Sequence, residues 1–155
     1  MEVIIRQERL TAEEYIAFLA RTDLGAQYPK ERFAERVGRL VRHASISLTA
    51  RRPDGTLIGV LLALTDFAYW MFITDMGVDR ACVGQGIGRR LFEAAHEIAG
   101  GRRDIIVYTC ANSGAVGFYE KMGMRRADDD VMQLSEIDWT PFVVGEAQDG
   151  ETGGV

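Results

Sequence analysis

The sequence predicts a single α/β domain built around a mixed β-sheet, and three observations support this fold class. Its 155 residues contain 47% hydrophobic and 26% charged side chains, ordinary values for a domain that buries a core without disulfides or metals. Apolar runs with the two-residue period of strands alternate with runs of helical period. Hairpin signals fill the first half, while helices separate the strands of the second half, so antiparallel pairs should precede parallel ones.

The first third of the chain is predicted to contain one strand and two helices. Residues 2–7 form a short apolar, β-branched strand. Thr11 followed three residues later by Glu14 is a capping-box signal for the first helix. Pro29 stands where the first turn of a helix tolerates proline, and apolar residues recur at helical spacing beyond it, so a second amphipathic helix is expected over residues 30–43.

Three strands should follow in the middle of the chain. Residues 45–50 and 57–67 flank the Pro-Asp-Gly turn at 53–55, and residues 69–78 are rich in aromatic and β-branched side chains. Short turns between strands favour antiparallel neighbours. We therefore expect these three strands to form the centre of the sheet.

The second half should alternate helices with strands. A helix is predicted over residues 86–99, and residues 104–110 form an apolar run of the kind buried in a sheet. Residues 112–123 should form a fourth helix, followed by one or two last strands within residues 124–137. The prediction is thus a mixed, mostly antiparallel sheet of six to seven strands with about four helices.

The domain is predicted to span residues 1–144. Residues 145–155 are acidic, rich in glycine and without large apolar side chains, so this tail is expected to be disordered. The apolar stretch 137–144 follows the last predicted strand without an evident partner. It should pack either at a homodimer interface or as a strand or cap on the same sheet.

Composition excludes several functional classes. The formal net charge of −5 argues against nucleic acid as a partner. No window is apolar enough to span a membrane or to act as a signal peptide, so we expect a cytoplasmic protein. Cys82 and Cys110 lack the spacing of metal ligands, and His43 and His96 lie on predicted helices away from any motif, so no metal is expected.

Three glycines alternate just before the helix predicted over residues 86–99: Gly84, Gly86 and Gly88. A glycine-rich turn between a strand and a helix exposes backbone N–H groups at the positive end of the helix dipole, which together form a cradle for phosphate. Arg89 and Arg90 in the first helical turn oppose that dipole unless an anion is bound. A flexible turn with both arginines in water is the alternative.

Two common nucleotide motifs do not fit this turn. A Walker A loop requires lysine and then serine or threonine after its last glycine, where Arg89 and Arg90 stand. The dinucleotide fingerprint requires the spacing G-x-G-x-x-G, and here the spacing is G-x-G-x-G. A nucleotide-binding regulatory domain is therefore disfavoured.

The sequence resembles the GCN5-related N-acetyltransferases, the GNAT superfamily, at two motifs. "VGQGIGRRL" after "DMGVD" is similar to their acetyl-CoA pyrophosphate motif, and "NSGAVGFYEKMGM" is similar to their later asparagine-to-"FYEKLGF" element. The sequence departs from the pattern at Val83, where the family has arginine or glutamine, and at Met124, where it has phenylalanine. The resemblance implies a GNAT fold with a splayed strand pair at the cofactor site, and acetyl-CoA as cosubstrate.

The resemblance also implies residue roles. Tyr119 matches the tyrosine that serves as general acid toward the thiolate, although it could instead be a buried aromatic of its helix. Asn112 matches an asparagine that contacts the cofactor, and it could also be a helix cap. Main-chain groups of the splayed strand and of the glycine turn should hold the cofactor, and the residues implied in cofactor binding are Met76, Val78, Val83, Gly84, Gln85, Gly86, Ile87, Gly88, Arg89, Asn112 and Phe118.

Asp75 is the candidate general base. It is a carboxylate within an apolar strand, so burial could raise its pKa. It could equally point to solvent or to an arginine, and a water chain could act as base instead. For the acceptor the resemblance points to Tyr28 and less firmly to the acidic run 128–130, which could bind an ammonium group or merely be solvated.

The function implied is direct transfer of an acetyl group from acetyl-CoA to a primary amine on a small molecule or peptide. The alternative is a non-catalytic module of the same fold that binds or senses acyl-CoA. The presence of both Tyr119 and the glycine turn favours the enzyme, since a binder would need no general acid.

Overall fold

A computed structural model describes residues 1–26, 28, 29 and 31–137 of the chain. Within these residues the structure is one five-stranded sheet in the order β1-β2-β3-β4-β5. The first four strands are antiparallel to their neighbours, and β5 is parallel to β4. The strand bounds are β1 Ile4–Gln7, β2 Ile46–Arg51, β3 Leu57–Thr65, β4 Trp70–Val78 and β5 Ile106–Thr109.

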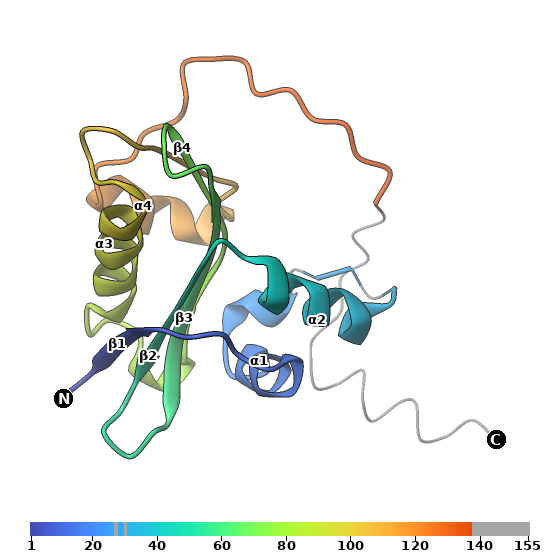
Figure 1. Ribbon diagram of the computed structural model, residues 1–155, viewed down its shortest axis with the longest axis vertical. Coiled ribbons are helices and arrows are strands. Elements are labelled where there is room, and N and C mark those ends of the chain that lie inside the picture. The colour runs from blue at the N-terminus through green and yellow to red at the C-terminus, as the bar shows by residue number, and fades with distance from the viewer. Residues whose placement is uncertain (27, 30, 138–155) are drawn as a thin grey trace.

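Helices lie on both faces of this sheet. Figure 1 shows α1 and α2 on one face and α3 and α4 on the other. Thr11 is the N-cap of the first helix, as the predicted capping box requires, because its hydroxyl accepts a hydrogen bond of 3.1 Å from the backbone N–H of Glu14. The Glu14 carboxylate accepts a hydrogen bond from Arg51 at 2.7 Å. The helix bounds are α1 Ala12–Leu19, α2 Phe33–His43, α3 Ile87–Ala99 and α4 Val116–Lys121.

The two helical layers bury two separate cores. On the α3 face, Leu91 and its helical neighbours pack against Leu48 and Leu61 of the sheet. On the α1–α2 face, Phe18 and Val37 pack against Val60. Leu61 and Ala63 of β3 belong to the core on the α3 face and Val60 and Leu62 to the other, as expected for a strand buried on both faces.

A bulge in β4 interrupts this alternation. Asp75 lies opposite Leu62 of β3, whereas Ile73 lies opposite the next residue, Ala63, so Thr74 is the extra residue. Ile73 therefore faces the α3 core, while Asp75 faces the α1–α2 side. One inserted residue thus turns a carboxylate toward α1 in the middle of the sheet.

The sheet has fewer strands than the six to seven predicted. Within residues 124–137 the structure contains neither strand nor helix, and Figure 1 shows this segment leading away from α4 as an extended chain. Two arginines and three aspartates fall within residues 125–130. Burying such a run of charges against a sheet would require the removal of their hydration, which is energetically costly. This cost explains why the segment is exposed to solvent. The apolar residues that follow are exposed as well, Met132 by 92% and Leu134 by 96%.

The run at 104–110 is an edge strand within the described chain rather than a buried one. Ile105 is buried, but Ile106 is half-exposed and the rest of β5 is only partly covered. The predictions for residues 138–144 and for the tail at 145–155 concern residues outside those described. No helix of the described chain has the length and apolarity needed to cross a bilayer.

Candidate functional site

The site lies where β4 and β5 stop pairing. The last paired residues are Ile73 and Thr109, and β4 continues to Val78 while β5 ends. In the described structure no strand pairs with the β5 side of β4 beyond this point. Backbone groups of Met76 and Val78 are therefore placed at an open edge, the kind of edge to which an extended ligand can hydrogen bond.

The glycine turn joins the end of β4 to α3. Gly84 has φ +85° and Gly86 has φ +79°, values that L side chains rarely adopt, and a Cβ atom at either position would meet nothing within 4 Å. Backbone conformation, and not crowding by the protein, therefore explains these two glycines. The open space borders the first turn of α3, whose N–H groups have no partner within the helix. This arrangement fits the pyrophosphate of acetyl-CoA.

Gly88 has a packing role. A Cβ atom there would lie 3.2 Å from two ring atoms of Phe118. The glycine thus allows α4 to approach α3, and the Phe118 ring contacts Tyr119 edge-on with ring centroids 5.2 Å apart. Two residues implied in cofactor binding therefore also fix the position of Tyr119.

The two arginines after the turn already have partners in the protein. Arg89 donates to the Glu93 carboxylate at 3.0 Å, and Arg90 donates to the Val3 carbonyl at 3.0 Å. Both side chains are exposed. Each arginine therefore has a partner within the protein at the first turn of α3, and the binding of an anion at this turn stays a prediction.

Asp75 is buried beneath α1. Its side chain is only 7% exposed, and its Oδ2 accepts a hydrogen bond of 2.5 Å from the Tyr15 hydroxyl. Burial raises the pKa of Asp75 to about 6, and the hydrogen bond from Tyr15 opposes that rise. Asp75 is therefore buried with a raised pKa and does not point to solvent, and its hydrogen-bond partner is a tyrosine instead of an arginine.

Two tyrosines extend this contact toward the segment between α1 and α2. The Tyr15 and Tyr28 hydroxyls lie 3.2 Å apart, and the Tyr28 ring packs edge-on against Phe33. Burial, followed by the nearby Asp75, holds the pKa of Tyr15 well above its ordinary value, so Tyr15 remains a donor at neutral pH. Sequence reasoning missed Tyr15 because it falls on the apolar face of α1; the one available signal was a hydroxyl at a core position, which requires a partner.

Tyr119 approaches the same site from α4. It is half-buried, and burial raises its pKa. A hydrogen bond with Thr109, the last residue of β5, acts in the opposite direction, and the Asp75 carboxylate raises the pKa further. A tyrosine in this state keeps its proton at neutral pH and can donate it.

The end of β4 also anchors the segment that carries Tyr28. Arg80 donates to the carbonyls of Ala20 and Thr22 and to the Asp23 carboxylate. A Cβ atom on Gly77 would lie 2.6 Å from Leu24, so this glycine lets the short helical turn Asp23–Ala26 pack on β4. Arg80 has no local signal in the sequence, because its importance depends on contacts distant in the chain.

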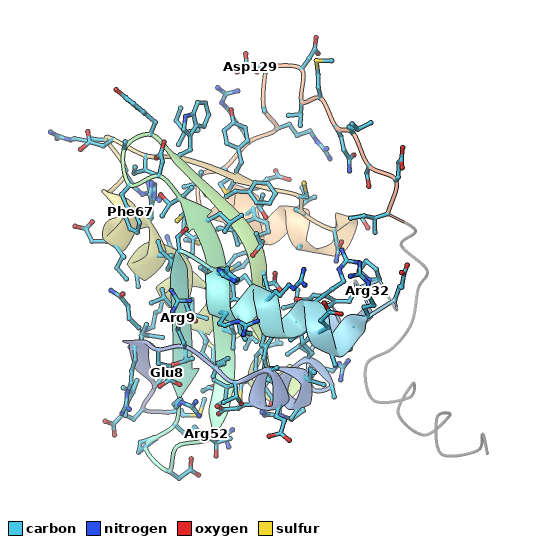
Figure 2. All side chains as sticks on the ribbon, turned by 45° about the vertical axis from the view of Figure 1, so that its right-hand side comes forward. Glu8, Arg9, Arg32, Arg52, Phe67 and Asp129 are labelled. Atoms are coloured by element: carbon cyan, nitrogen blue, oxygen red, sulfur yellow. The ribbon has the colours of Figure 1, made fainter. Side chains whose placement is uncertain are left out.

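Other predicted residues are not brought into this cluster. Asp128 forms an exposed ion pair with Arg125 at 2.6 Å, and Figure 2 shows Asp129 on the extended C-terminal segment at the edge of the molecule. Asn112 is exposed, and its side chain makes no capping hydrogen bond. Across the described residues no group of three or more His, Cys, Asp or Glu side chains could hold a metal ion.

Comparisons with known proteins agree with this geometry. The family model described as acetyltransferase (GNAT) family matches residues 11–124. None of the curated proteins compared with the chain matches it. A GNAT-family acetyltransferase from Streptococcus pneumoniae superposes with a TM-score of 0.67 at 18% identity, covering 87% of this chain and 99% of that one. The PaiA N-acetyltransferase of Thermoplasma acidophilum, solved in complex with coenzyme A, superposes with a TM-score of 0.62 at 19% identity, covering 84% and 94%.

Proposed function

The chain belongs to the acetyltransferase (GNAT) family, and from that premise we propose that it transfers an acetyl group from acetyl-CoA directly to a primary amine. The observation that supports this reaction best is Asp75. It is a buried carboxylate with a pKa of about 6, and it directly precedes the open edge of β4. A carboxylate tuned toward neutrality is suited to accept a proton from a bound ammonium group.

The cofactor would lie along the open edge and the glycine turn. Backbone groups of Met76 and Val78 would hydrogen bond the pantetheine arm, and the N–H of Met76 would polarise the acetyl carbonyl. The N–H groups from Val83 to Gly88 and the start of α3 would hold the pyrophosphate. When bound, acetyl-CoA supplies an acetyl thioester that an amine can attack.

Asp75 and Tyr119 would perform the proton transfers. Asp75 accepts the proton that the substrate ammonium loses, which frees the nitrogen lone pair to form the new N–C bond. As the C–S bond breaks, Tyr119 donates its hydroxyl proton to the departing sulfur, and the second proton that the nitrogen loses after the N–C bond has formed returns to the Tyr119 phenolate. Tyr15 donates a hydrogen bond to one oxygen of Asp75, so it would act as a positioning residue, and the other oxygen would accept the proton.

Binding and turnover test the proposal separately. Acetyl-CoA and CoA are titrated calorimetrically into the purified protein, and a panel of primary amines is then screened by release of free thiol. Saturable binding with amine-dependent thiol release is the expected result. Binding without release from any amine would favour the non-catalytic acyl-CoA module, and the absence of binding would contradict the cradle.

Gly86→Ala tests the cradle with a matched control. The substitution strains a residue in the left-handed region, within the turn whose N–H groups would bind the pyrophosphate. The Kd for acetyl-CoA should therefore rise about tenfold. Gly55→Ala is the control, because Gly55 has φ +91° with equally open surroundings in the β2–β3 turn. It should cost similar stability and leave the Kd unchanged; an equal effect on binding from both variants would contradict the assignment.

Tyr119→Phe tests the general acid. The change keeps the ring beside Phe118 and removes only the proton donor, so kcat should fall about 10²-fold while the Kd for acetyl-CoA remains unchanged. Steady-state kinetics and calorimetry provide the two readouts. Tyr69→Phe removes a hydroxyl from an exposed tyrosine and should alter neither.

A further inference from the structure

An apolar hollow of about 530 Å³ lies at the β3–β4 hairpin end of the sheet. Helices α1 and α2 cover the neighbouring part of the same sheet face but not this part (Figure 1). A hollow of this volume is within the range of small-molecule sites. Its lining residues are Ser45, Leu64, Thr65, Asp66, Trp70, Met71, Phe72 and Tyr108.

The lining exposes large apolar side chains. Leu64 is 49% exposed, Trp70 50% and Phe72 39%. The Trp70 and Tyr108 rings lie side by side, with centroids 5.7 Å apart and planes inclined by 33°. When large apolar side chains are exposed together in one patch, the patch is often a binding site.

The hollow lies on the same face of β4 as Asp75. Phe72 lies opposite Leu64 and Asp75 opposite Leu62, and two residues separate side chains that share one face of a strand. Phe72 and Asp75 are therefore on the same side of the sheet, and because the bulge adds one residue between them, they are separated by two regular strand positions, roughly 7 Å. A ligand with a nitrogen at Asp75 would place the rest of its body over Phe72 and Trp70.

Charge in the hollow suits a cationic ligand with a hydrocarbon body. The lining residues that the structure describes include no lysine or arginine. The Asp66 Oδ1 atom accepts hydrogen bonds from the N–H groups of Ala68, Tyr69 and Trp70, so this oxygen holds the hairpin turn, while the carboxylate adds a negative charge at the edge of the hollow. The aromatic faces of Trp70, Phe72 and Tyr108 attract apolar groups and ammonium groups alike.

We propose that the acceptor is a primary amine with an aromatic or aliphatic hydrocarbon body, such as an arylalkylamine, whose body occupies the hollow while its nitrogen reaches Asp75. This inference rests on the proposed function and specifies its acceptor. Polyhydroxylated or polycationic amines would leave their polar groups against Leu64, Trp70 and Phe72, where the described structure offers them few partners.

Turnover of matched amines provides the first test. Phenethylamine should have a kcat/KM about 10- to 200-fold above that of ethanolamine, the range that apolar pocket contacts supply. Trp70→Ala should reduce kcat/KM for phenethylamine about tenfold, mainly through KM, and leave ethanolamine and the Kd for acetyl-CoA unchanged. Tyr69→Ala is the control, because Tyr69 adjoins Trp70, is 67% exposed and does not line the hollow. Equal turnover of both amines, unaffected by Trp70→Ala, would overturn the inference while the transferase stands.

Fluorescence provides a readout independent of turnover. The chain has two tryptophans, so Trp139→Phe leaves Trp70 as the reporter in the full-length protein. Its emission should be that of a water-exposed indole and should change saturably with phenethylamine but not with ethanolamine. If no amine is acetylated yet this change occurs, the proposed transferase fails and the ligand class of the hollow stands. The inference would be overturned if the emission did not change with phenethylamine. It would also be overturned if the emission before any addition were that of a buried indole, because another segment or a second copy would then cover the face.

Discussion

The two faces of the sheet are built from different kinds of residue. On the α3 face, the buried core is entirely aliphatic, aromatic or sulfur-containing, with Leu48, Leu61 and Leu91 at its centre. The α1–α2 face also buries aliphatic residues, but it includes a carboxylate, Asp75, hydrogen bonded to Tyr15. It is also the face whose hairpin end is left exposed at Trp70.

The α3 face therefore mainly stabilises the fold, whereas the α1–α2 face carries a group that is suited to chemistry. For Asp75, a pKa of about 6 in the folded protein against an ordinary value of 3.8 means that folding disfavours its ionised form. The sign follows from linkage: the stability that Asp75 contributes is fully present below its unfolded pKa and is lost as the pH rises through about 6. At pH 7 the ionised carboxylate then costs about 3 kcal/mol. A face that retains such a group is expected to be selected for reactivity.

Asp75→Asn should have the largest effect on activity. It removes the proposed base and keeps an acceptor for the Tyr15 hydroxyl, so kcat should fall about 10²- to 10⁴-fold. Because the buried charge is also removed, the free energy of unfolding at pH 7 should be no lower than that of the parent and could rise toward the cost estimated above. Steady-state kinetics and urea unfolding at pH 5 and pH 7 measure both quantities.

The stability gain should be greater at pH 7 than at pH 5, where much of Asp75 is already protonated. Asp104→Asn provides the control, since Asp104 is an exposed carboxylate away from the site. A variant that lost activity and stability together, with no dependence on pH, would show that Asp75 is a structural residue instead of a base.

Leu91→Ala tests the other face. Leu91 is fully buried between α3 and the sheet, so its truncation should lower the free energy of unfolding by about 2–5 kcal/mol. The kcat of the remaining folded protein should change little, because Leu91 contributes no group to the catalytic site. Ile106→Ala, at a half-exposed position of β5, should cost less than about 0.5 kcal/mol. A large loss of kcat in folded Leu91→Ala would mean that the two faces are coupled.

Much of the fold could be predicted from local sequence signals. The N-cap at Thr11, the Pro-Asp-Gly turn and the helical period after Gly86 each correspond to an element of the structure. The last strands could not be predicted reliably, because residues 124–137 combine a strand-like apolar pattern with a dense charge run, and desolvation of the charges opposes the pattern. Periodicity alone also could not distinguish a central strand from an edge strand at β5.

The candidate site was predictable where its groups lie within a motif. Asp75, Tyr119 and the glycine turn are local features of the sequence, and the structure places them around the open edge of β4. Tyr15 and Arg80 could not be found in this way, since their importance comes from contacts with residues about 60 positions distant. The bulge at Thr74, which turns Asp75 toward Tyr15, leaves no local signal either.

A smaller effect should distinguish the two tyrosines near Asp75. Tyr15→Phe preserves the ring that packs on Phe18 and removes the hydrogen bond that lowers the pKa of Asp75, so that pKa should rise above about 6. The acidic limb of the pH profile of kcat/KM should then move upward by about one pH unit. Tyr28→Phe leaves the Tyr15–Asp75 bond intact, so its profile should move less. The charge of Asp75 also raises the pKa of Tyr119, and Tyr119 is unchanged in both variants. An equal shift in the two variants would mean that Tyr28 acts on Asp75 as strongly as Tyr15 does. No shift in either variant would mean that Asp75 is not the group that accepts the proton.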